Sequence, residues 1–209
     1  MAGDDSIQPF YGSTSYVHRV GEELTGVVVF IAAIWGVFLL EYVTPIDAWG
    51  LVPRRVTGLV GIVTMTFLHG GWGHLLGNTV PLFVLLTLLA GSRERSWLVT
   101  LLIIVIGGSL LWVFGRTANH QGASLLIFGL ITFLISSGAY FERRPATVLT
   151  ALVVGLLYGT TLLFGVLPKF GTASQVSWDG HLCGAIAGVI VASLLATRRS
   201  SLPLATTLD

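Results

Sequence analysis

Residues able to carry out acyl transfer recur in this sequence near the beginnings of long apolar stretches. They are a serine, two histidines and an asparagine, namely Ser124, His181, His74 and Asn78. A serine hydroxyl is a weak nucleophile until a neighbouring base takes its proton, and a neutral histidine is the usual base. The carbonyl oxygen under attack becomes an oxyanion, which needs preorganised hydrogen-bond donors. The set therefore contains the groups that a serine hydrolase requires.

The positions of these residues along the chain suit that chemistry. His74 and Asn78 are four positions apart, so they project from one face of a helix and could both donate to an oxyanion. Ser124 would open a helix, whose unpaired N–H groups and positive dipole end then lie beside the hydroxyl. Nucleophile, base and oxyanion donors are all present.

The elements that must position these residues are those of a membrane protein. The chain has 209 residues, of which 54% are apolar and only 10% charged, with a mean hydropathy of +0.85. A soluble domain carries about 25% charged residues. A membrane helix needs about 20 apolar residues. Stretches without Asp, Glu, Lys or Arg cover residues 24–40, 56–92, 96–115, 117–141, 145–168 and 180–197.

The stretch 56–92 is too long for one span and too short for two. It is interrupted by the segment His69-Gly70-Gly71-Trp72-Gly73-His74, and the part before it, 56–68, is too short to cross. We expect 56–68 to be interfacial or re-entrant. The sequence thus predicts an all-α polytopic membrane domain, 24–197, between polar cytoplasmic segments 1–23 and 198–209. Its six spans are expected near 24–43, 74–91, 96–115, 123–141, 146–166 and 180–197.

Charge predicts the orientation of these spans. Six spans place both termini on one side, and that side holds seven of the eleven basic residues, Arg19, Arg93, Arg95, Arg143, Arg144, Arg198 and Arg199. The positive-inside rule therefore places both termini in the cytoplasm, and we expect a multi-pass protein of the plasma membrane. The four candidate residues then lie at the outer beginnings of inward-running spans. A site that they form would open to the extracytoplasmic side.

Several function classes are disfavoured. A net charge of +1 provides no nucleic-acid footprint. The single cysteine, Cys183, excludes an intrachain disulfide and offers no metal cluster. No carboxylate lies among His69, His74 and His181, and no His-Glu-x-x-His motif occurs, which argues against a zinc protease. No inverted repeat indicates a transporter. We expect neither a metal nor a cofactor.

Each candidate residue also has a structural interpretation when it is taken alone. A serine at a helix start is usually an N-cap, and Asn78 could join two membrane helices by hydrogen bonding. His181 could be an interfacial histidine, and His69 is interpreted as structural. Polar groups inside a membrane are costly, so an intramembrane histidine or asparagine is a functional hypothesis by default. The joint occurrence of the candidates favours catalysis.

Three segments in order resemble the rhomboid family of intramembrane serine proteases. The segment FLHGGWGHLLGN resembles the family's second-helix pattern of two histidines and an asparagine. The segment HQGASLLIFG resembles the Gly-x-Ser-Gly nucleophile motif that opens the fourth helix, with Gly122 as its first glycine. The segment GHLCGAIAG resembles the sixth-helix histidine and the glycines that follow it. They occupy residues 67–78, 120–129 and 180–188.

The resemblance implies a role for each matching residue. Ser124 would be the nucleophile and His181 the general base, forming a dyad without a carboxylate. The backbone N–H of Ser124 and the side chains of His74 and Asn78 would form the oxyanion hole, and Phe128 would face the His181 ring. A stripe of small residues would let the sixth helix approach the fourth closely, and it consists of Gly180, Gly184 and Gly188.

Leu125 is the one clear departure, because the family usually has the second glycine of its motif at this position. A leucine there could splay the fourth and sixth helices. Alternatively, its side chain could occupy the space left by Gly184, Ala185 and Gly188. We expect the second arrangement, because the opposing stripe is unusually small.

Two functions follow from the resemblance. The first is hydrolysis of a peptide bond in or near the transmembrane segment of a membrane-protein substrate within the bilayer. The second is a catalytically silent rhomboid-like protein that binds transmembrane segments. Silent relatives normally lose the serine or the histidine, and this sequence retains both Ser124 and His181.

Overall fold

The predicted six-span helical architecture is confirmed. The computed structural model describes residues 12–92, 95–168 and 177–200, and this part of the chain contains six helices long and apolar enough to cross a membrane. The protein is an integral multi-pass membrane protein. Its long helices are α1 (Gly12–Glu41), α3 (Trp72–Ser92), α4 (Ser96–Phe114), α5 (Ser124–Ser136), α6 (Pro145–Gly165) and α7 (Trp178–Ser200). A π-helical segment, η3 (Ser137–Glu142), extends α5 to the length of a full span.

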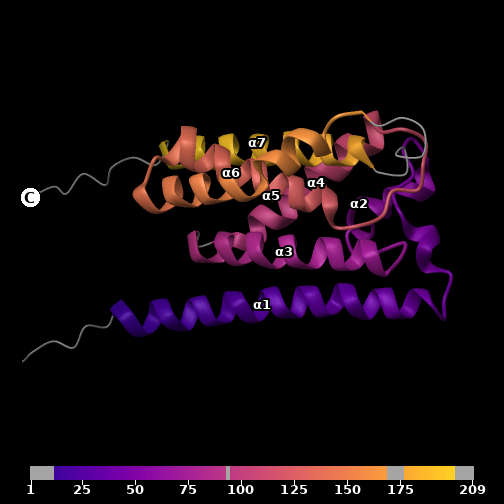
Figure 1. The fold of residues 1–209 in the computed structure, drawn as a ribbon, viewed down its shortest axis with the longest axis horizontal. Helices are drawn as coiled ribbons and strands as arrows, with labels where there is room; N and C mark the ends of the chain where they lie inside the picture. Colours follow the sequence, from indigo (N-terminus) through magenta and orange to yellow (C-terminus); the bar gives the residue numbers. More distant parts are fainter. Residues whose placement is uncertain (1–11, 93–94, 169–176, 201–209) are drawn as a thin grey trace, which may run out of the picture.

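The ends of the long helices are arranged as six spans require. In Figure 1, the beginning of α1 and the end of α7 lie at the same end of the bundle. Helix α1 begins at Gly12, within the polar segment 1–23, so the helix starts before the apolar stretch does. Residues 1–11 and 201–209, which make up much of the predicted terminal segments, lie outside the described residues.

The segment 56–68 forms no long helix. Three short elements fold between α1 and α3, namely η1 (Ile46–Trp49), η2 (Val56–Leu59) and α2 (Gly61–Thr64). This folding is possible because two glycines allow backbone contact: a Cβ on Gly58 would overlap Val52, and one on Gly61 would overlap Leu51. The backbone of Leu51 in turn pairs with that of His120, with N···O distances of 3.0 and 2.8 Å. The folded segment is thereby attached to the loop that precedes α5.

Helix α5 lies at the centre of the bundle. It is apolar on every side, and such helices are found buried. All residues from Leu125 to Leu134 are buried, with α3, α4, α6 and α7 packed around them. Helices α1 and α6 are the least buried spans, and in Figure 1 α1 runs along one edge of the bundle beside α3.

Two glycines bring α5 and α7 into backbone contact. A Cβ on Gly184 would overlap the carbonyl oxygen of Leu125, and a Cβ on Gly188 would overlap that of Gly129. Beside the second contact, the Thr132 hydroxyl donates to the carbonyl oxygen of Ala185 over 2.8 Å. Small residues allow this approach, since packing rather than the hydrophobic effect joins helices in lipid.

Gly180, the third member of the predicted stripe, does not take part in this interface. A Cβ on Gly180 would meet the Ser177 hydroxyl, and its nearest neighbour on another helix is Leu111 of α4, at 3.6 Å. The small-residue stripe against α5 therefore consists of Gly184 and Gly188, because Gly180, at the start of α7, lies nearer to α4.

Replacement of Gly184 by alanine should lower stability. The added methyl group overlaps the backbone of Leu125, and overpacking of a well-packed interface costs about 1–3 kcal/mol. Gly159→Ala in α6 is the matched control, because a Cβ there meets nothing within 4 Å. Thermal unfolding in detergent should show a lower midpoint for Gly184→Ala only. Equal midpoints for both variants would contradict the close α5–α7 contact.

Candidate active site

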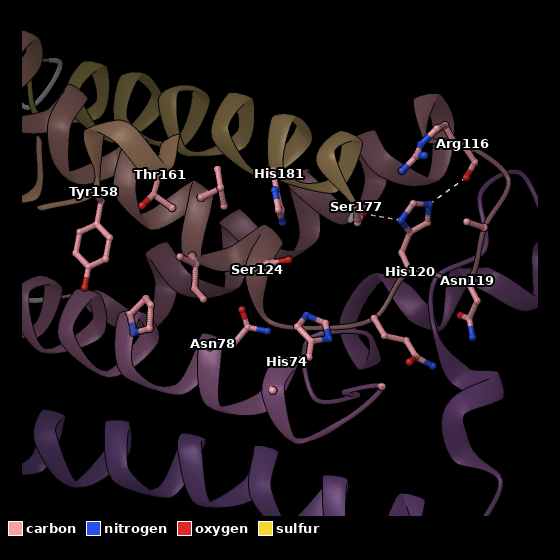
Figure 2. A pocket seen from close by; sticks show the side chains of 18 residues that line it. His74, Asn78, Arg116, Asn119, His120, Ser124, Tyr158, Thr161, Ser177 and His181 are labelled. Atoms are coloured by element: carbon pink, nitrogen blue, oxygen red, sulfur yellow. Dashed lines mark hydrogen bonds between the residues drawn. The ribbon is translucent and has the colours of Figure 1, made fainter. Parts of the chain in front are cut away.

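A cavity of about 800 Å³ is lined by residues of α3, α5, α6 and α7 and of the loop between α4 and α5. Figure 2 shows its side chains, with Ser124 near the centre. The four residues selected from the sequence for their chemistry all line this cavity: Ser124, His181, His74 and Asn78. Topology alone had placed them at one depth, and the structure brings them to one cavity.

Gly122 shapes the turn that precedes Ser124. Its φ of +110° is a conformation that residues with a Cβ rarely adopt. Its backbone N–H donates to the carbonyl oxygen of Met65 over 2.8 Å. A Cβ at this position would lie 2.5 Å from two ring atoms of His74 and 3.3 Å from Asn78 Nδ2. The absence of a side chain therefore lets both candidate donors approach the backbone beside Ser124.

Asn78 provides a donor that no described residue of the protein uses. Its side chain is buried, and its Nδ2 has no hydrogen-bond partner among the described residues. A buried donor without a partner costs about 1–3 kcal/mol. In Figure 2 this amide lies beside His74 and Ser124. The amide is thus a candidate donor to an oxyanion that forms beside Ser124.

The His181 ring is held on one face and at one nitrogen. The Phe128 ring stacks on it with centroids 4.1 Å apart and an interplanar angle of 5°. His181 Nδ1 lies 2.9 Å from the carbonyl oxygen of Gly165. Because a carbonyl only accepts, this bond requires the proton on Nδ1 and leaves Nε2 as the basic nitrogen of the neutral ring. Figure 2 shows the ring directed from α7 toward Ser124.

The separation of Ser124 and Phe128 along α5 explains why the Phe128 ring contacts His181. Ser124 and Phe128 are four residues apart, so both project from the face of α5 that meets His181. Gly165, at the end of α6, makes room for the aromatic ring, because a Cβ there would overlap Phe128. Sequence reasoning did not identify Gly165, since nothing in its own neighbourhood distinguishes it from the other glycines of α6.

The Asp179 carboxylate binds Arg116 and not His181. Its carboxylate accepts from the backbone N–H of Arg116 over 2.8 Å and from Nη2 of the same residue over 3.1 Å. This contact occupies both carboxylate oxygens. These bonds direct the Asp179 carboxylate toward Arg116, as expected for the dyad without a carboxylate that the family resemblance implies.

His69 lies outside the long helices, and its contacts are structural. Its backbone N–H donates to the Glu41 carboxylate at the end of α1, with N···O distances of 3.1 and 3.3 Å. Burial, followed by the nearby His74 ring, lowers the pKa of His69 to about 4. The ring is therefore neutral at physiological pH. Its position joins α1 to the segment that leads into α3.

Leu125 does not splay α5 and α7. The prediction that its side chain fills the space left by Gly184, Ala185 and Gly188 is wrong. Its backbone, rather than its side chain, lies against Gly184. The side chain points to α4, where a Cβ on Gly107 would lie 2.8 Å from Leu125 Cδ2. There it joins an apolar cluster with Leu51, Met65, Leu111 and Cys183. A glycine on α4 therefore compensates for the glycine missing from α5.

The cavity also contains residues that the sequence patterns did not select. Tyr158 and Thr161 line it from α6, and His120 and Ser177 line it beside the α4–α5 loop and the start of α7. Tyr158 and Thr161 are polar residues within a predicted span, which is a signal that could have identified them. His120 stood within a recognised segment without an assigned role.

Replacement of Gly122 by alanine should lower the reactivity of Ser124. The substitution strains a backbone with φ of +110° and pushes the His74 ring away from the turn. A displacement near 1 Å costs on the order of 10²-fold in rate. Gly73→Ala is the control, because Gly73 also lines the cavity but a Cβ there meets nothing within 4 Å. The measurement is the rate of Ser124 labelling by a fluorophosphonate, and similar losses in both variants would contradict this role of Gly122.

Comparison with known proteins adds relatives to this geometry. An "uncharacterized protein" of Mycobacterium tuberculosis is 39% identical over 181 residues, covering 82% of this chain and 74% of the relative. A similarly named protein of Mycobacterium leprae is 39% identical over 179 residues, covering 81% and 70%. A protein of Acanthamoeba polyphaga mimivirus that is named as a rhomboid protein is 27% identical over 150 residues, covering 68% and 79%.

The chain also matches a protein family over most of its length. The sequence pattern of the rhomboid domain matches residues 56–198, which include α3 to α6, nearly all of α7 and every residue discussed above as a candidate for chemistry. The names of the mycobacterial relatives state no function, so these relatives provide no evidence about activity. The chain belongs to the rhomboid family.

Proposed function

We propose that this protein is an intramembrane serine protease that uses Ser124 and His181 as a catalytic dyad. The observation that carries the proposal is the state of His181. Its Nδ1 is bonded to the carbonyl of Gly165 and its face is stacked on Phe128, which leaves Nε2 as the base in the cavity that Ser124 lines. Family membership supports the same reaction class.

The reaction proceeds in two steps. His181 Nε2 takes the proton of the Ser124 hydroxyl while Oγ attacks the peptide carbonyl carbon, and the imidazolium then protonates the departing amine. Water, deprotonated by the same nitrogen, then attacks the acyl carbon, and the imidazolium returns the proton to Ser124 Oγ as the bond between Oγ and the acyl carbon breaks and the acid is released. In both steps, the oxyanion accepts hydrogen bonds from Asn78 Nδ2, the His74 ring and the backbone N–H of Ser124.

The substrates are segments of other membrane proteins. The site lies among the beginnings of α3, α5 and α7, inside a bundle whose outer surface faces lipid. A substrate helix hides its carbonyl groups in its own hydrogen bonds, so it must unwind locally before it can react. The reaction requires no metal and no cofactor.

The dyad residues should be indispensable, and the oxyanion donors should be partly replaceable. Ser124→Ala and His181→Ala each abolish turnover, since nucleophile and base act as a unit. Asn78→Ala and His74→Ala lower the rate by about 10²–10³-fold, the typical loss for one oxyanion donor. The measurement is cleavage of a reconstituted transmembrane substrate, together with fluorophosphonate labelling. A wild-type protein that folds but does not label would replace this proposal with a silent binder of transmembrane segments.

We further propose that the termini face the cytoplasm of a plasma-membrane protein and that the site opens outward. In a Cys183→Ala background, Thr117→Cys should react with an impermeant maleimide in intact cells, whereas Arg144→Cys should not. Both positions are exposed and lie in loops at opposite ends of the bundle. Both thiols should react after lysis. Labelling of Arg144→Cys alone in intact cells would reverse the orientation.

A further inference from the structure

A side-chain hydrogen bond joins the loop before α5 to the start of α7. His120 Nδ1 lies 2.7 Å from the Ser177 hydroxyl, and Figure 2 shows the contact beside Ser124 and His181. His120 precedes Ser124 by four residues, and Ser177 precedes His181 by four. The carbonyl of Ser177 also accepts the backbone N–H of His181 over 3.0 Å. The bond therefore links the two chain segments that carry the proposed dyad.

The His120 ring is fixed at both nitrogens. Its Nε2 lies 3.0 Å from the carbonyl oxygen of Arg116. Since a carbonyl only accepts, Nε2 carries a proton, and Nδ1 shares a hydrogen bond with the Ser177 hydroxyl. The backbone of His120 pairs with Leu51 in the segment between α1 and α3. This buried residue thus holds three segments of the chain together.

An ion pair reinforces the same contact. The Arg116 guanidinium and backbone N–H both bind Asp179, and the guanidinium carbon lies 5.3 Å from the centroid of the Trp178 ring. One Asp179 oxygen is 3.8 Å from His120 Nε2, and the other is 3.4 Å from the Ser177 hydroxyl. Arg116 and Asp179 therefore form an ion pair directly beside the His120–Ser177 bond.

We infer that His120 and Ser177 are positioning residues that set the distance between Ser124 and His181. This inference rests on the proposed function. The backbone contacts at Gly184 and Gly188 fix α5 against α7 further along both helices, after the dyad. The His120–Ser177 bridge fixes the same two segments before the dyad. Ser124 and His181 are thus held between two clamps, and loss of one lets the first turn of α7 move.

Removal of the Ser177 hydroxyl tests the bridge with a small change. Ser177→Ala should slow fluorophosphonate labelling of Ser124 on the order of 10-fold, a smaller loss than the roughly 10²-fold cost of a 1 Å displacement, because the contacts at Gly184 and Gly188 remain. Ser177→Thr, which keeps the hydroxyl, should restore most of the rate. Ser193→Ala is the control in the same helix, where the lost hydroxyl donates to the carbonyl of Ile190, away from the cavity. It should label at the wild-type rate.

A second readout reports the geometry without turnover. In a Ser124→Cys, Cys183→Ala background, a thiol near the imidazole ionises at lower pH than an isolated thiol, whose pKa is about 8.5. The pH dependence of its alkylation by iodoacetamide measures that pKa. Adding Ser177→Ala should move the pKa toward the value found with His181→Ala. His120→Gln should act in the same direction, and combining it with Ser177→Ala should add little.

The two readouts separate this inference from the proposed function. A wild-type protein that does not label would remove the protease proposal, while the thiol pKa would still decide whether the bridge positions His181. A Ser177→Ala variant with a lower melting temperature but unchanged labelling rate and thiol pKa would overturn the inference. A loss of rate in Ser177→Thr equal to that in Ser177→Ala would also overturn it, because the hydroxyl would then be irrelevant.

Discussion

The backbone contact between α5 and α7 determines the orientation of everything in the site. In lipid, an apolar helix such as α5 gains little from turning one face inward, because its surroundings are as apolar as its neighbours. Gly184 and Gly188 fix how the two helices are rotated against each other, since only one rotation of α7 about its axis places these glycines against the carbonyls of Leu125 and Gly129. That rotation also fixes the directions in which Ser124 and His181 project. Specificity of packing here comes from the absence of side chains.

Other glycines extend this rule to the remaining contacts. Gly107 of α4 receives the Leu125 side chain, Gly165 of α6 receives the Phe128 ring, and Gly122 receives the His74 ring. In each case, a missing Cβ on one element accommodates a large side chain from another. Each of these contacts in the site therefore pairs a glycine with a large side chain. A leucine can replace the glycine of the family motif at position 125 because Gly107 on the neighbouring helix leaves room for its side chain.

The sequence predicts the spans well because hydropathy and charge act locally, and the interruption at His69–His74 correctly excludes a seventh span. It also selects Ser124, His181, His74 and Asn78, since polar groups are costly in lipid. It misses the early start of α1 at Gly12, because a helix outside the bilayer leaves no hydropathy signal. It cannot give the neighbours of Leu125, Gly165 or His120. These depend on contacts between residues far apart in the chain, which no local pattern encodes.

The unpartnered amide of Asn78 has a consequence for inhibitor chemistry. A buried N–H without an acceptor among the described residues costs free energy, and a ligand atom that accepts from it recovers that cost. Compounds that direct one electronegative oxygen at this amide complete a hydrogen bond that no side chain of the described protein supplies. Compounds that direct an ammonium group there place two donors against each other. Selectivity within this site therefore depends on the polarity of a single ligand atom as well as on reactivity toward serine.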